Sequence, residues 1–89
     1  MPDTTVTEQG YEIAEHVRDD GETTMVARIN GEPVWVACKL LVPIGVYHWQ
    51  VFPFIRRDLN ALVLNKDAAR AWLEHEAAHA LLAAKVVAA

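Results

Sequence analysis

The sequence predicts an α+β fold, in which an antiparallel meander of four to five strands is followed by one long C-terminal helix packed on one face. Short segments with period-two alternation of apolar residues, separated by Gly- and Asn-rich turns, predict the strands. The last third is rich in Ala and free of Gly and Pro, which predicts the helix. With 89 residues, we expect a flexible polar N-terminus at residues 1–8 and a single α+β domain at residues 9–89.

Alternation predicts the first three strands over residues 11–18, 23–29 and 34–41. A turn containing Asp20-Gly21 joins the first pair, and Asn30-Gly31 predicts a type I′ turn between the second pair, because that turn needs positive φ at both central positions. In the third strand the apolar face is expected to comprise Val34, Val36, Cys38 and Leu40, with Trp35, Ala37 and Lys39 on the other face.

Pro43 and Gly45 interrupt the alternation, and a fourth strand is predicted over residues 46–52. Residues 54–64 are ambiguous: we expect a turn at 57–60 and a short fifth strand, with a helical turn as the alternative. Asn65 is a good N-cap for a helix that runs to about Val87. The expected core is Tyr11, Ile13, Val17, Met25, Ala27, Ile29, Val34, Val36, Cys38, Leu40, Tyr47, Trp49, Val51, Leu62, Leu64, Trp72, Leu73, Val86 and Val87.

The composition narrows the function classes. A net charge of −4 with eight scattered Lys and Arg disfavours nucleic-acid binding. The N-terminus has no signal-peptide pattern and no stretch is apolar enough to span a membrane, so we expect a cytoplasmic protein. One cysteine excludes an internal disulfide and a cysteine-based zinc site. The high Ala, Val and Arg content is typical of a GC-rich bacterial or phage genome.

Residues His75-Glu76-Ala77-Ala78-His79 form an H-E-x-x-H pattern within the predicted helix. Two histidines four residues apart lie on one helical face, where both can reach one metal ion, and the glutamate can activate a metal-bound water. A helical wheel places these three polar residues with Trp72 and Leu73, on the side expected to face the sheet. We therefore expect them to ligate a metal, to be hydrogen-bonded or to line a cleft.

Residues 73–81, Leu-Glu-His-Glu-Ala-Ala-His-Ala-Leu, resemble the active-site helix of zincin metallopeptidases. The resemblance implies that His75 and His79 are zinc ligands and that Glu76 is the general base. Residues 80–89 offer no zinc ligand, whereas catalytic zinc normally has three protein ligands. A third ligand is therefore expected from another chain or from upstream, where the candidates are His48, Asp58, His16 and Glu12.

Two functions follow from these patterns. The first is a small soluble interaction or regulatory protein, such as a phage or bacterial inhibitor or adaptor, that binds a protein partner or self-associates. Its predicted partner-binding residues are Trp35, which is either covered by the chain or exposed as an anchor, and Arg56 and Arg57, which otherwise form a solvated turn. The alternative is a minimal zinc-dependent hydrolase or peptidase that uses the H-E-x-x-H residues.

Overall fold

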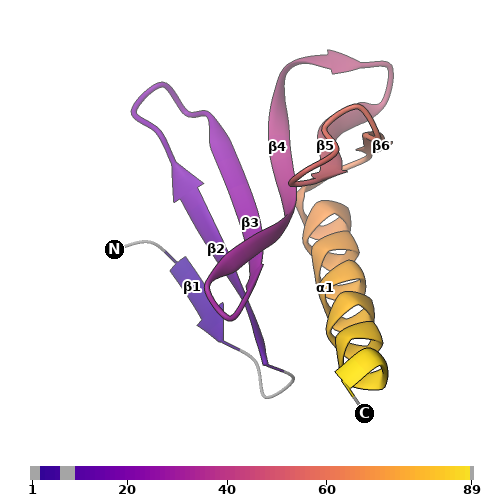
Figure 1. Cartoon of the computed structure of the whole chain (residues 1–89). Coiled ribbons are helices and arrows are strands. Elements are labelled where there is room, and N and C mark those ends of the chain that lie inside the picture. The colour runs from indigo at the N-terminus through magenta and orange to yellow at the C-terminus, as the bar shows by residue number, and fades with distance from the viewer. Residues whose placement is uncertain (1–2, 7–9, 89) are drawn as a thin grey trace.

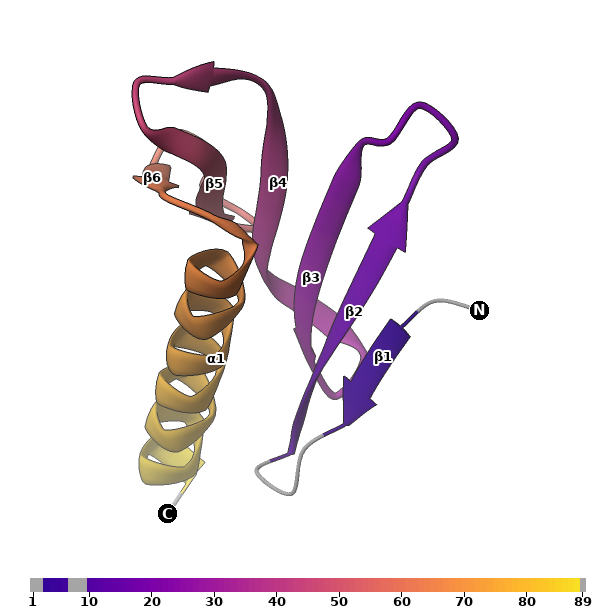
Figure 2. The same ribbon diagram turned by 180° about the vertical axis from the view of Figure 1, so that it is seen from behind.

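One antiparallel sheet, whose strand order follows the sequence, packs one face against a single C-terminal helix (Figures 1 and 2). The computed structural model describes the backbone of residues 3–6 and 10–88 and the side chains of residues 10–83. The elements are β1 (Asp3–Val6), β2 (Tyr11–Val17), β3 (Thr23–Ile29), β4 (Glu32–Ile44), β5 (Tyr47–Pro53), β6 (Ala61–Val63) and α1 (Lys66–Ala88). The predicted meander and helix are confirmed, with one strand more than expected because Asp3–Val6 pairs with β2.

Tight turns with positive φ connect the central strands. Asn30 (φ 54°) and Gly31 (φ 80°) form the two-residue turn between β3 and β4, as the type I′ prediction requires. Between β4 and β5, Ile44 pairs with Tyr47 across a two-residue turn whose first residue, Gly45, has φ 60°. A positive φ at the first position only is the type II′ pattern, which also suits the right-handed twist of a hairpin.

The core lies between α1 and the sheet face that carries the side chains of Ile13, Met25 and Val51. From the helix, Ala69, Leu73 and Ala77 recur every fourth residue and are fully buried. Small side chains on both layers allow the backbones to approach closely, and the larger ones fill the remaining space. The full core cluster is Tyr11, Ile13, Met25, Ala27, Ala37, Trp49, Val51, Val63, Ala69, Leu73 and Ala77.

Two polar contacts fix the first turn of α1. The Oδ1 atom of Asn65 accepts a hydrogen bond from the backbone N–H of Ala68 at 2.8 Å, which confirms Asn65 as the N-cap. The Lys66 ammonium forms an ion pair with Glu15 of β2, whose side chain is only 10% exposed. This pair links the start of the helix to the sheet face that the helix covers.

From Trp35 to Lys39 the alternation in β4 is as predicted, but the expected assignment of the two faces is reversed. Val34 lies at a register shift between β3 and β4 and packs against the core, as expected. The helix covers the side of Trp35 and Ala37, while Val36 is buried on the opposite face. There it lies in a cross-strand row with Ala14, Val26 and Phe52. The small Ala37 side chain lets α1 approach its side of the strand, which an apolarity count cannot detect.

Several residues of the expected core are exposed instead. These are Val17, Tyr47, Leu64 and Trp72. The side chains of Val86 and Val87 lie outside the described residues. No described helix is both long and apolar enough to cross a membrane.

The molecule is elongated because β4 and β5 extend beyond the part of the sheet that α1 covers (Figure 1). The radius of gyration is 13.3 Å, compared with about 12 Å for a compact domain of this length. At the far end of the pair, β4 is irregular: Lys39 pairs with Trp49 and Ile44 with Tyr47, so the four residues 40–43 face His48 alone. The β4–β5 end therefore projects from the body without a layer over it.

Candidate functional site

The two histidines of the H-E-x-x-H pattern lie on the side of α1 that faces away from the sheet, while Glu76 lies at the border of the buried side. His75 and His79 are exposed and Glu76 is half-buried, whereas Leu73 and Ala77 are fully buried against the strands. The prediction that the motif faces the sheet is therefore wrong for His75 and His79. The helix meets the sheet through a stripe of mainly small residues, and this turns both histidines outward.

The two histidines belong to a regular stripe along the open side of α1. Its spacing alternates between four and three residues, which keeps side chains on one side of a helix. We call it the outer stripe, and its described members are Ala68, Trp72, His75, His79 and Leu82. None of these residues carries a permanent charge. Trp72, at one flank, packs against Trp35 with ring centroids 6.4 Å apart and planes tilted by 52°.

A shallow hollow of about 500 Å³ adjoins this stripe near the start of α1. It is lined by Ala68, Ala71, Trp72, His75 and Glu76. The lining is mostly apolar, and the imidazole of His75 lies at its border together with the Glu76 carboxylate. The open side of α1 thus combines apolar surface with nitrogen ligands.

The residues proposed as a third zinc ligand do not join the histidine pair. The alternation of β5 places His48 on the sheet face away from α1, because its neighbour Trp49 points into the core. Asp58 lies in the β5–β6 loop, where Arg56 donates two hydrogen bonds to it at 2.8 and 3.0 Å. The Arg56 guanidinium lowers the pKa of the Asp58 carboxyl below its usual value.

The two other upstream candidates, Glu12 and His16, share the face of β2 that carries Ala14, which is opposite to the face of the core residue Ile13. Among residues 10–83, no group of three or more His, Cys, Asp or Glu side chains could hold a metal ion. Two imidazoles alone do not fit the three-ligand set of a catalytic zinc. The described part of one chain therefore supplies two imidazole ligands, those of His75 and His79, where a tetrahedral zinc site needs four ligands.

The predicted partner-binding residues lie in three different settings. Trp35 is half-buried on the helix-covered face and contacts Trp72. Arg56 is paired with Asp58, while the Arg57 guanidinium lies 5.9 Å from the ring centroid of Phe52. The interpretation of Trp35 as a freely exposed anchor does not match its contacts, and a role for the two arginines in binding stays a prediction.

One exposed apolar feature of the described residues was missed from the sequence. At the end of the β4–β5 hairpin, Leu41 is 83% exposed, Val42 76% and Val46 65%. We call this end the apolar tip, and it comprises Leu41, Val42, Ile44, Val46 and Tyr47. The signal was present in residues 40–46, which form the end of β4 and the turn after it and contain no polar side chain. Turns normally carry polar residues. This run therefore indicates an exposed apolar surface, and not only an interruption of the strand pattern.

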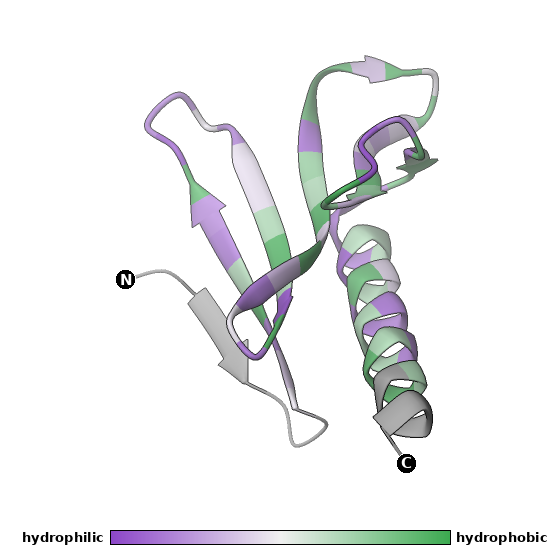
Figure 3. Cartoon of the chain, viewed as in Figure 1, coloured by the Kyte–Doolittle hydropathy of each residue, from purple (hydrophilic) through white to green (hydrophobic). Residues whose placement is uncertain are grey.

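An acidic turn, which connects β2 and β3, lies at the same end of the sheet as the apolar tip (Figures 1 and 2). Figure 3 shows hydrophobic colouring along the tip and hydrophilic colouring on the β2–β3 turn. The turn contains Asp19, Asp20 and Glu22, and Arg18 is the cation paired with the last two, at 3.5 and 2.9 Å.

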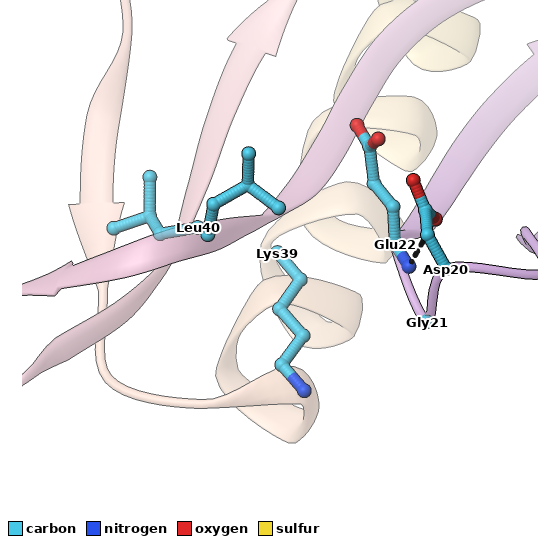
Figure 4. A pocket seen from close by; sticks show the side chains of 6 residues that line it. Asp20, Gly21, Glu22, Lys39 and Leu40 are labelled. Carbon is cyan, nitrogen blue, oxygen red and sulfur yellow. Dashed lines mark hydrogen bonds between the residues drawn. The ribbon is translucent and has the colours of Figure 1, made fainter.

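The acidic turn and Leu41, the first residue of the apolar tip, border one hollow of about 240 Å³. Asp20, Gly21 and Glu22 line it from the turn, and Lys39, Leu40 and Leu41 line it from β4. Figure 4 shows Asp20 and Glu22 lying together across from Leu40, while Lys39 extends from the other side of β4. Leu40 and Leu41 therefore lie close to the acidic turn, and Lys39 lies there with them.

Comparison of the chain with protein-family models, curated proteins and solved structures gave no match. The resemblance to zincin peptidases is thus confined to residues 73–81.

Proposed function

We propose that this chain is a small interaction protein that binds a protein partner through the apolar tip. One observation carries the proposal: five large apolar side chains are exposed together at the end of a hairpin that extends past the body of the molecule. Apolar groups gathered in this way are unfavourable in water, and on soluble domains such patches typically mark binding surfaces.

The hairpin geometry supports this use of the tip. The type II′ turn at Gly45 brings the two strand ends together, so that Ile44 and Tyr47 lie opposite each other. Cross-strand pairing holds the backbone in place before binding, and less conformational entropy is then lost when a partner docks. Tyr47 adds an aromatic side chain with a hydroxyl group, a residue type that is enriched at protein interfaces.

The acidic turn indicates the chemistry of the partner. Asp19, Asp20 and Glu22 carry three negative charges, and Arg18 forms ion pairs with two of these residues, Asp20 and Glu22, while Lys39 lines the same hollow. A matching surface would place an apolar pocket over the tip and basic residues over the turn. Such complementarity raises association rates and favours the correct partner. The net charge of −4 also favours association with a basic partner. This surface suits the predicted role of an inhibitor or adaptor.

Site-specific photo-crosslinking in extract of the native host tests the proposal. A photo-reactive amino acid at Val42 should give one discrete adduct, because this side chain would lie inside the interface. The matched control is the same amino acid at Ile55, which is 86% exposed but lies in the β5–β6 loop.

A second substitution, Ile44→Asp, should abolish the adduct formed from position 42 while leaving the far-ultraviolet circular dichroism unchanged. The Asp20→Lys/Glu22→Lys double variant should weaken capture by reversing the charge of the turn. An identical set of adducts from positions 42 and 55, or an adduct that survives Ile44→Asp, would show that the apolar tip is not the binding surface.

A further inference from the structure

We infer that the outer stripe of α1 is a zinc-dependent homodimer interface, in which His75 and His79 of two copies together complete one four-histidine Zn²⁺ site. This surface is separate from the apolar tip and the inference does not depend on the proposed function. The observation that leads to it is an incomplete ligand set in an open position. Two exposed imidazoles lie one helical turn apart, and the described part of the chain brings no further ligand to them.

The ligand chemistry favours zinc. Imidazole nitrogen is a preferred ligand of Zn²⁺, and structural zinc sites are closed by four protein ligands in tetrahedral geometry. Histidines at positions i and i+4 of a helix can both reach one ion. A second copy offers an identical pair, so two chains supply the four nitrogens that one chain lacks. Mg²⁺ prefers oxygen ligands and should not replace zinc here.

The position of the pair along α1 fits a two-fold axis. His75 precedes Ala77 by two residues and His79 follows it by two. A two-fold axis that crosses the outer stripe between the two histidines, level with Ala77 along the helix, therefore sets each histidine opposite the other one of the second copy. Ala77 is also the middle residue of α1, which has 23 residues from Lys66 to Ala88. An antiparallel pair centred there overlaps along the full helix length, about 34 Å at 1.5 Å per residue.

The apolar residues of the outer stripe obey the same symmetry. Trp72 precedes Ala77 by five residues and Leu82 follows it by five, so each Trp72 would contact the second copy's Leu82. Both side chains are exposed in the single chain, at 37% and 62%. The four-three spacing of the stripe is the pattern by which helices pack side by side.

Access to His75, His79 and Leu82 is open in the monomer, whereas Ala68 packs against the core cluster and Trp72 is partly covered by Trp35. In Figures 1 and 2 the sheet lies on one side of α1 and no described strand covers the opposite side. The charged side chains of Arg70 and Glu74 pair with each other at 3.6 Å away from the stripe, so they do not oppose contact between two copies. Antiparallel helices also bring opposite ends of their dipoles together.

The surface is too small to associate firmly without the metal. Each copy contributes Trp72 and Leu82 as its only large apolar side chains among the described members of the stripe, whereas stable interfaces typically use about 20–30 residues a side. The ion is therefore the main source of affinity, and the chain should be a monomer when metal is removed.

Sedimentation velocity of the full chain, combined with metal analysis, tests this inference. Protein stripped with EDTA should sediment as a monomer of 9.9 kDa. Added ZnSO₄ should double the mass and bind at one ion per two chains, and MgCl₂ should do neither. His75→Ala and His79→Ala should each abolish the zinc-dependent dimer. The matched control is His48→Ala, which removes an exposed histidine from the other face of the sheet and should leave the dimer intact.

A further variant separates the helix contact from simple chelation. Leu82→Glu keeps both histidines but places a carboxylate opposite Trp72 of the second copy, and it should weaken zinc-dependent dimerisation about tenfold or more. Circular dichroism of each variant checks that the helix is retained. Zinc binding at one ion per chain without a change in mass, a dimer that persists in EDTA, or zinc-induced association in the His75→Ala/His79→Ala variant would each overturn the inference.

Discussion

Small side chains decide which side of α1 faces the sheet. Ala69 and Ala77 flank Leu73 on the buried side, and they meet Ala27 and Ala37 of the strands. A helical wheel favours the side with the bulkiest apolar residue, which is why Trp72 was expected in the core. Alanine contributes little apolar area, but it allows the backbones of the helix and the sheet to approach closely. Which side of the helix packs best is therefore set by the shape of the sheet and not by the helix sequence alone.

At single positions, the predictions that succeeded depend on backbone chemistry. Asn30-Gly31 was predicted correctly because few residues tolerate positive φ, and Asn65 because its side chain can accept a bond from a free helical N–H. Local rules of this kind need no knowledge of the remaining chain. The outward direction of His75 and His79 depends on tertiary packing, so the sequence could identify the pair but not its surroundings.

Cys38 gives a test at the level of one residue. Burial raises the pKa of its thiol above the ordinary value of 9.0, despite an opposing hydrogen bond with Thr24. At pH 8 the thiolate fraction is therefore lower than in an unfolded chain, and reaction with a disulfide reagent should be slower in the native protein than in urea. A spectroscopic rate measurement checks this, and equal rates in both states would contradict it.

The same shift has a consequence for stability. The folded pKa of Cys38 is raised, so its contribution to the free energy of unfolding is fully present below the ordinary pKa of 9.0 and is lost as pH rises through the folded value. The Cys38→Ala variant lacks this titration. The difference in stability between the two proteins should therefore change only under alkaline conditions.

At the level of elements, β4 shows where sequence patterns are insufficient. Pro43 and Gly45 normally end strands, yet β4 continues to Ile44. Pro43 lies among the four residues 40–43, which face His48 alone. Strand pairing is irregular there, so the N–H that proline lacks does not interrupt a regular series of hydrogen bonds. β1 was missed for a different reason: the sequence Asp3-Thr4-Thr5-Val6 is polar and short, and pairing with β2 defines it.

The start of α1 provides a test at the same scale. Asn65→Ala removes the acceptor that satisfies the N–H of Ala68, so the free energy of unfolding should fall by about 0.5–2 kcal/mol. Urea denaturation measures this change. Asn65→Asp is the matched control, since its carboxylate can accept the same bond and should retain most of the stability. Equal losses in both variants would show that the cap is not the cause.

At the scale of the whole molecule, the two proposed surfaces lie apart. The apolar tip projects beyond the sheet at the end nearer the start of α1, and the outer stripe follows the open side of the helix (Figures 1 and 2). An antiparallel dimer would therefore carry one tip at each end. A bivalent molecule of this kind gains avidity for a partner with two matching sites, without any new contact within each site.

The orientation of α1 is the feature on which the zinc-bridged dimer depends, because a motif that faced the sheet could not meet a second copy. The two sides of the helix should respond differently to truncation. Leu73 is fully buried, whereas His75 and His79 are exposed on the outer stripe.

The most direct measurement is the free energy of unfolding in urea, in the presence of EDTA, for Leu73→Ala and for the His75→Ala/His79→Ala double variant. The first should lose about 2–5 kcal/mol because it leaves a cavity in the core. In the double variant, the free energy of unfolding should change by no more than about 0.5 kcal/mol for each of the two exposed histidines replaced. A large loss in the double variant together with a small one in Leu73→Ala would show that the motif faces the sheet and would contradict this account.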